Sequence, residues 1–203
     1  FINVRDGATL KNFVIQEPEN ASALDAADPN APVYEALVTA DTAKVAIEKV
    51  TFRGAMESQR MGIHFSGSPA GQPVVDQCVF GLLATGIQID GPLPLVRRCF
   101  FDHLTVAGIR FVEGAGSKAD ASTSFSDATD ANTGYNTFNG FDGKTKAVEN
   151  NRSSEISMPN NDWGTDDPSA ISGMAPGVAS VPALPAGSGL VPASMYCSVW
   201  NAK

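Results

Sequence analysis

The stretch VDQCVF at Val75–Phe80 is followed 21 residues later, from Phe80 to Phe101, by VRRCFF at Val96–Phe101. Both segments place apolar residues first, fourth and sixth, with polar residues mostly between them. The pattern also occurs in LKNFVI at 10–15 and IEKVTF at 47–52, and in weaker form in TGYNTF at 133–138. Because successive side chains of a β-strand point to opposite faces, this alternation indicates short, half-buried strands.

A second short strand accompanies these copies. The segments are ALVT at 36–39, GIHF at 62–65, GIQI at 86–89 and GIRF at 108–111. Two short strands with a glycine at the bend, repeating every 21 to 24 residues, are typical of a solenoid whose coils bury one face against their neighbours. An α-solenoid would need helices of ten or more residues, and the period here is two. We therefore predict an all-β fold, a parallel β-helix of about five to six coils.

Stacked coils would bring equivalent residues into internal columns about 4.8 Å apart. The first strands predict three such columns: Leu10/Ile47/Val75/Val96, Phe13/Val50/Cys78/Cys99/Asn136 and Ile15/Phe52/Phe80/Phe101/Phe138. The second strands predict two more: Ile63/Ile87/Ile109 and Phe65/Ile89/Phe111.

This coil pattern, the G-I-x-hydrophobic strand that follows it and the segment NNDWGTDDP at 160–168 resemble right-handed β-helix proteins of the pectate-lyase-like superfamily. In that family an N-N-x-W-G segment often closes a run of coils. The resemblance implies a right-handed parallel β-helix over residues 1–170. It implies little about activity.

The rest of the chain differs in composition. Residues 16–35 and 114–134 are rich in Pro, Ala, Asp, Ser and Gly and predict two loop insertions. Residues 171–203 predict an extended Pro/Gly/Ala-rich tail that ends in the apolar segment Met195–Trp200. That segment would cover an open coil end, dock on the side of the helix or pair with another subunit.

The net charge of −8 and the absence of a basic cluster exclude a nucleic-acid partner. No run of 18 apolar residues predicts a membrane span. The start at Phe1 predicts a processed chain or an excised domain, and a surface rich in Ser, Thr, Asn, Asp and Gly favours an extracellular or cell-surface location.

One polar row is a candidate ligand site. His64, Gln88 and Arg110 occupy the outward position of successive second strands. Hydroxyl groups of a glycan would bond to His64 and Gln88, and a sugar carboxylate would pair with Arg110. An ordinary solvated sheet face is the competing interpretation.

Cys78 and Cys99 fall at the same place in successive coils, as either a buried thiol column or a disulfide. Cys197 is then free or intermolecular.

The sequence predicts no catalytic residues. A lyase would need clustered carboxylates for calcium and a basic residue, whereas the outward rows Glu48/Asp76/Arg97 and Lys49/Gln77/Arg98 set acids singly among bases. Vertical pairs such as Asp76 with Arg97 would stabilise the sheet modestly. There is no CxxC or HExxH zinc motif, and only a weak calcium signal at Asp166-Asp167 and in the acids of residues 120–130.

These observations favour a non-catalytic extracellular or cell-surface module with a structural or adhesive role and glycan contact along one flank. Its partners would be a polysaccharide or another copy of itself. Two alternatives remain open: a polysaccharide lyase or glycoside hydrolase, or a fragment of one, acting on acidic glycans, and a self-assembling filament subunit.

Overall fold

The computed structural model describes residues 2–5, 7–17, 36–41, 44–55, 58–67, 72–91, 93–113, 134–179 and 183–188. Both predicted insertions fall largely outside these residues. The apolar segment Met195–Trp200, with Cys197, lies entirely outside them.

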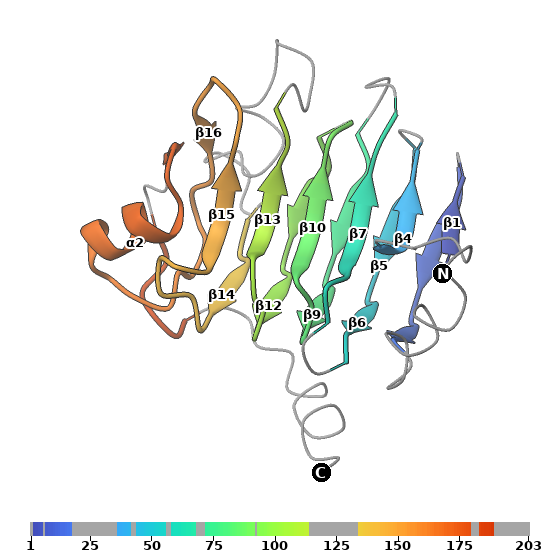
Figure 1. Cartoon of the computed structure of the whole chain (residues 1–203), viewed down its shortest axis with the longest axis horizontal. Helices are drawn as coiled ribbons and strands as arrows, with labels where there is room; N and C mark the ends of the chain where they lie inside the picture. Colours follow the sequence, from blue (N-terminus) through green and yellow to red (C-terminus); the bar gives the residue numbers. More distant parts are fainter. Residues whose placement is uncertain are drawn as a thin grey trace.

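The described strands form three long parallel sheets (Figure 1). Sheet A contains, in spatial order, β1 (Ile2–Val4), β4 (Ala36–Ala40), β7 (Met61–Phe65), β10 (Thr85–Ile89), β13 (Ala107–Phe111) and β15 (Lys146–Asn150). Sheet B contains β2 (Thr9–Lys11), β5 (Ala46–Glu48), β8 (Val74–Asp76) and β11 (Leu95–Arg97). Sheet C contains β3 (Val14–Gln16), β6 (Thr51–Arg53), β9 (Val79–Gly81), β12 (Phe100–Asp102) and β14 (Thr137–Asn139). The chain visits A, B and C in turn and returns to A one strand along, which is consistent with a parallel β-helix.

The first four coils therefore have three strands each rather than the two predicted from sequence, and in the fifth coil the sheet-B strand is reduced to a bridge between Arg97 and Gly134. The six-residue repeat is divided by a residue with positive φ, such as Gln77 (φ 55°) or Arg98 (φ 54°). The same left-handed conformation recurs at Asn12, Lys49, Tyr135 and Asn160. This bend separates sheet B from sheet C, so the predicted outward row Lys49/Gln77/Arg98 lies in turns and not on a strand.

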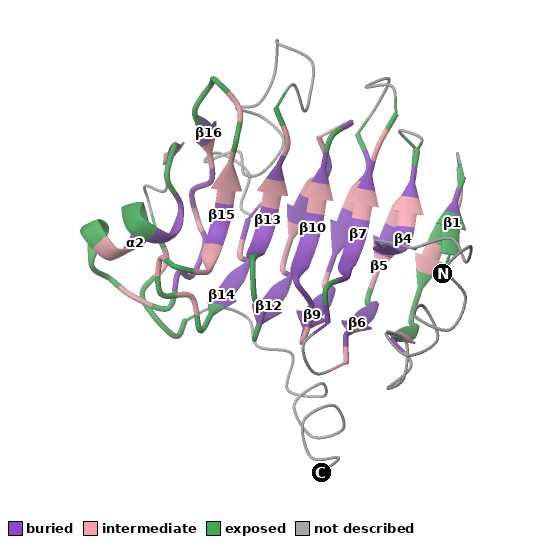
Figure 2. Ribbon diagram, viewed as in Figure 1, coloured by how far each residue is buried: buried purple, intermediate pink, exposed green. Residues whose placement is uncertain are grey.

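The register confirms the stacking of the predicted columns. Ile47 pairs with both Leu10 and Val75, Ile87 pairs with Ile63 and Ile109, and the interior of the stack is buried (Figure 2). The expectation that Phe13 is internal is wrong, because its side chain is 55% exposed. The Phe13 carbonyl accepts from the Thr51 N–H (2.9 Å), as the equivalent carbonyls do in the later coils. Among the described residues, however, the first coil has a neighbour on one side only, so the Phe13 ring is left uncovered on the other side.

The aromatic column is continuous through sheet C and beyond it. The rings of Phe52, Phe80, Phe101 and Phe138 stack at centroid distances of 4.9, 4.9 and 5.0 Å, with interplanar angles of 7° or less. Trp163 adds a last ring 4.9 Å from Phe138, and only 1% of its surface is exposed. The tryptophan of the NNDWG segment thus ends the column.

Glycine in the strands of sheet A makes room for these rings. A Cβ added to Gly86 would lie 2.6 Å from the Gly108 carbonyl oxygen and 2.8 Å from Cδ1 of Phe101. Gly62 stands in the same relation to Phe80. The repeated glycine is thus required by close packing against the next coil.

We expect Gly86→Ala to lower the free energy of unfolding by about 1–3 kcal/mol, because the new methyl group overpacks the core. Urea denaturation measures this change. Gly173→Ala is the matched control, since nothing lies within 4 Å of a Cβ there and alanine favours the helix by about 0.5–1 kcal/mol. Equal effects of the two substitutions would contradict the packing argument.

The C-terminal end of the stack is covered. Helix α2 (Pro168–Met174) is capped at its N-terminus by Asp167, whose side chain accepts from the Ser169 N–H (2.9 Å), and it buries Ile171 and Met174. Beyond the helix, β17 (Val178–Ala179) pairs with β16 (Ile156–Ser157). These elements occupy the start of the predicted extended tail, so the boundary between residues 170 and 171 falls inside α2. Asp167 followed by Pro168 is a helix-start signal in the sequence.

No helix in the described part of the chain is long and apolar enough to cross a membrane.

Candidate functional site

The predicted polar row lies along the outer face of sheet A. Gln88 pairs in register with His64 on one side and with Arg110 on the other. Thr39 extends the row beyond His64, and Glu149 extends it beyond Arg110. All five side chains are half-buried. We call these five residues the outer polar row.

The two basic side chains of the row lie next to acids. His64 Nε2 lies 2.8 Å from Asp90 Oδ2, and Arg110 Nε lies 3.0 Å from Glu149 Oε2. Sequence reasoning missed both acids. Aligning Ala147-Val148-Glu149-Asn150 with Gly108-Ile109-Arg110-Phe111 would have placed Glu149 in the row. Because Arg110 already has a carboxylate partner, a sugar carboxylate would have to compete for it.

A second charged group lies on sheet B and in the adjoining turn. Asp76, 6% exposed, accepts from Arg98 Nε (2.8 Å) at one oxygen, and its other oxygen is bound by both Arg98 and Arg97. The hydrogen bond to Asp76 raises the pKa of Arg98. The predicted Asp76–Arg97 pair is present, at 3.4 Å. Arg98 is nevertheless the closer partner, so this carboxylate is fully engaged in holding adjacent coils together.

Cys78 and Cys99 are free and fully buried. The Sγ of Cys78 lies 3.4 Å from the Ile47 carbonyl oxygen, and that of Cys99 lies 3.3 Å from the Arg97 carbonyl oxygen. Burial, and next the neighbouring Cys78, raise the pKa of the Cys99 thiol well above its ordinary value. A protonated, buried thiol is a packing group rather than a nucleophile.

Asparagine takes over the cysteine position in the last coils. Asn136 donates to the Val96 carbonyl (3.0 Å) and to Asn161 Oδ1 (2.9 Å), and its own Oδ1 accepts from the Cys99 N–H (3.0 Å). Asn161 donates in turn to the carbonyl of Met158 (2.9 Å). Both side chains are fully buried, so this column closes the end of the stack with satisfied polar groups.

A buried ion pair joins segments that are far apart in sequence. Glu17 and Arg60 are 5% and 6% exposed, and Arg60 Nε lies 2.8 Å from Glu17 Oε1. Burial acts to raise the pKa of Glu17, but hydrogen bonds from Ser58, the Ala55 N–H and Arg60, with the Arg60 charge, outweigh it and hold that pKa below its ordinary value. The pair fixes the segment before β7 against the end of β3.

The residues around Asp102 form another polar group that sequence reasoning missed. Asp102, 3% exposed, accepts from Asn139 Nδ2 (2.8 Å), and its other oxygen lies 2.8 Å from His103 Nδ1. His103 lies in the turn after β12, with φ 50°. The carboxylate orients an imidazole that projects into solvent.

Asp166 and Asp167, the two acids of the weak calcium signal, both make structural hydrogen bonds. Asp166 accepts from the Ala186 N–H (2.8 Å), and Asp167 caps α2. The acids of residues 120–130 lie outside the described residues. Within the described part of the chain, no three or more His, Cys, Asp or Glu side chains are grouped to hold a metal ion.

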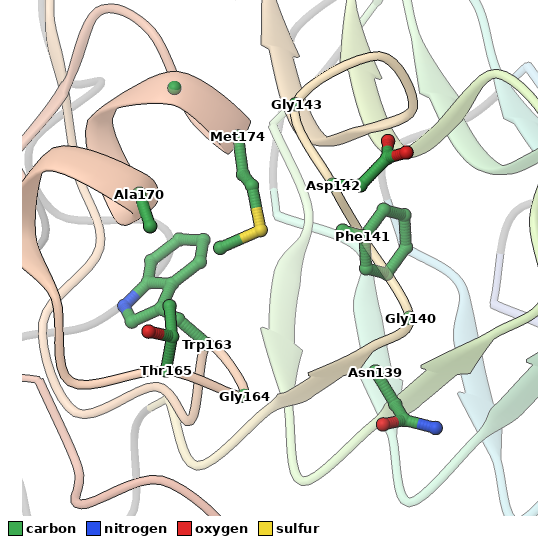
Figure 3. A pocket seen from close by; sticks show the side chains of 11 residues that line it. Asn139, Gly140, Phe141, Asp142, Gly143, Trp163, Gly164, Thr165, Ala170 and Met174 are labelled. Carbon is green, nitrogen blue, oxygen red and sulfur yellow. The ribbon is translucent and has the colours of Figure 1, made fainter.

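One cavity, of about 280 Å³, lies between α2 and the turn before β15 (Figure 3). Phe141, Trp163 and Met174 supply apolar walls. The Asp142 carboxylate turns away from Trp163 and accepts instead from the N–H groups of Lys144 (3.0 Å) and Thr145 (3.1 Å). The Asp142 carboxylate is therefore already engaged by the backbone of its own turn.

No family model, curated protein or solved structure matches this chain. The proposed function therefore rests on the architecture and on the outer polar row.

Proposed function

We propose that this chain is a non-catalytic extracellular or cell-surface module with a structural or adhesive role, which contacts glycans along the outer polar row. We also propose that its coils form the right-handed β-helix of the pectate-lyase-like superfamily. Handedness is supported by the general rule that about 98% of crossovers between parallel strands are right-handed. The superfamily is supported by the NNDWG segment, whose Trp163 ends the aromatic column.

The observation that carries the glycan proposal is the alignment of Thr39, His64, Gln88, Arg110 and Glu149 on consecutive strands. A linear ligand lying along the stack would meet one polar side chain about every 4.8 Å. Hydroxyl, amide, imidazole and guanidinium groups all exchange hydrogen bonds with sugar hydroxyls. Because Arg110 is already paired with Glu149 and His64 lies beside Asp90, the row favours a hydroxyl-rich, weakly charged glycan over a strongly acidic one.

The non-catalytic part of the proposal is supported by three carboxylates that are already bound to arginine side chains. Asp76 and Glu149 each bind a guanidinium group, and Glu17 does so in the interior. A general base needs access to the proton that it removes. Carboxylates held in this way serve the coil-to-coil contacts.

Titration calorimetry with a panel of neutral and acidic polysaccharides, with and without calcium, tests the proposal. We expect binding of a neutral glycan, weakened at least about tenfold by Gln88→Ala/Arg110→Ala, since each lost hydrogen bond contributes about 0.5–3 kcal/mol. Lys11→Ala, on sheet B, is the control and should bind normally. Release of oligosaccharides from any polymer would instead support a lyase or hydrolase, and failure to bind across the panel would refute glycan recognition.

A further inference from the structure

The N-terminal end of the stack differs from the covered C-terminal end. Strands β1, β2 and β3 are the outermost members of sheets A, B and C. Three of the four exposed large apolar side chains among the described residues lie on this first coil: Ile2, Phe13 and Val14, at 38, 55 and 66% exposure. We call this surface the first-coil face.

The same positions are buried wherever a coil lies on both sides. Val38, the register partner of Ile2, is fully buried, and Thr51, the partner of Val14, is 5% exposed. Leu10 and Ile15 are half-buried, whereas their partners Ile47 and Phe52 are fully buried. At Ile2, Leu10 and Ile15 the first-coil face therefore presents the apolar columns that the next coils use to contact one another.

The outer backbone edges of β1, β2 and β3 lie at the same end of the stack as these apolar side chains. At the junction of the first two coils each strand pairs in parallel with its counterpart in the next coil, and the outer edges of β1, β2 and β3 offer that same pairing. Charge does not oppose an approaching chain on sheet B, because Lys11 is paired with Glu48 at 2.6 Å. Edges of this kind are normally shielded by charge, proline or a covering element.

We infer that the first-coil face is a stacking surface for a further coil of three short parallel strands, with apolar residues in register with Ile2, Leu10 and Ile15. The partner is thus a β-helix coil of the kind this chain builds, adding one strand to each sheet. Such a partner covers the apolar side chains and satisfies the strand edges at once. At the other end, α2 and the β16–β17 pair occupy the corresponding position.

The chain's own coil provides the probe. Residues 61–86 are fused directly before Ile2 in place of Phe1, because Ile87, which follows Gly86, is the register equivalent of Ile2 through Ile63 and Val38. We expect the outward amides of β1, β2 and β3 to exchange at least about 100-fold more slowly than in the unfused chain. The midpoint of thermal unfolding should rise by at least about 5 °C.

The control fusion carries Ile63→Asp, Val75→Asp and Phe80→Asp in the added copy only, so that it cannot pack. If the intact fusion gives no more protection than this control, the inference is wrong.

A second copy of the chain is the other occupant to consider for this face, and light scattering on the unfused chain tests for it. We expect a monomer of 21.2 kDa. A dimer that Val14→Asp abolishes and Val106→Asp preserves would identify a second copy on this face and overturn the inference; Val106, 40% exposed, lies away from the first coil.

Discussion

Replacing Phe101 by alanine should lower the free energy of unfolding by about 3–5 kcal/mol, because it leaves a cavity in the middle of the aromatic column. Phe101 is fully buried and stacks on Phe80 and Phe138 at 4.9 and 5.0 Å. Its removal deprives both neighbours of a contact, and a rigid stack cannot collapse around the space. Urea denaturation followed by circular dichroism measures the loss.

Phe141→Ala is the matched control for this substitution. Phe141 contacts Phe138 edge-on at 6.0 Å and is only half-buried, so we expect a smaller loss. A loss below about 1 kcal/mol for Phe101→Ala would mean that the column does not hold the coils together.

Arg60→Met should also destabilise the protein by about 3–5 kcal/mol, because it leaves the Glu17 carboxylate buried without its counter-charge. The double variant Glu17→Gln/Arg60→Met should recover part of this loss, since no charge is then left unpaired. Lys11→Met, which breaks the exposed pair with Glu48, should cost at most about 1 kcal/mol.

The ion pair also predicts a dependence on pH. The pKa of folded Glu17 is lowered from its ordinary value of 4.5, so its contribution is fully present above that value. It is lost as the pH falls through the folded pKa, because protonation removes the charge. Urea denaturation between pH 3 and pH 7 should therefore show a steeper acid loss for the unsubstituted chain than for the double variant. Parallel profiles would contradict this role for Glu17.

The repeat could be predicted from sequence because equivalent residues touch in the stack. Phe80 and Phe101 share a column, so the same side chain suits both places, and the spacing in sequence reports the length of one coil. The division of each repeat into two strands was missed, because residues such as Gln77 and Arg98 adopt positive φ without being glycine or asparagine. In this conformation their N–H groups donate to the next coil, to the carbonyls of Arg97 and Gly134.

The candidate site was only half predictable. His64, Gln88 and Arg110 follow from the repeat, but Asp90 lies beyond the end of its strand and reaches back to His64 across 26 positions. Glu17 and Arg60 are 43 positions apart and belong to segments outside the repeat pattern. Contacts of this kind depend on how the turns project from the stack, which periodicity does not specify.

The register of sheet A is the claim on which the row, the columns and the first-coil face all depend. A cysteine pair, His64→Cys/Gln88→Cys in a Cys197→Ser background, tests it most directly. Register partners lie about 4.8 Å apart, within the Cα separation that a disulfide spans. The control pair Thr39→Cys/Gln88→Cys uses the same face but is two strands apart. We predict that mild oxidation of the folded chain links the first pair, seen after proteolysis as a cross-linked peptide that joins residues 64 and 88, and leaves the control pair unlinked. Equal linkage of both pairs, or linkage of neither, would contradict the stacked register.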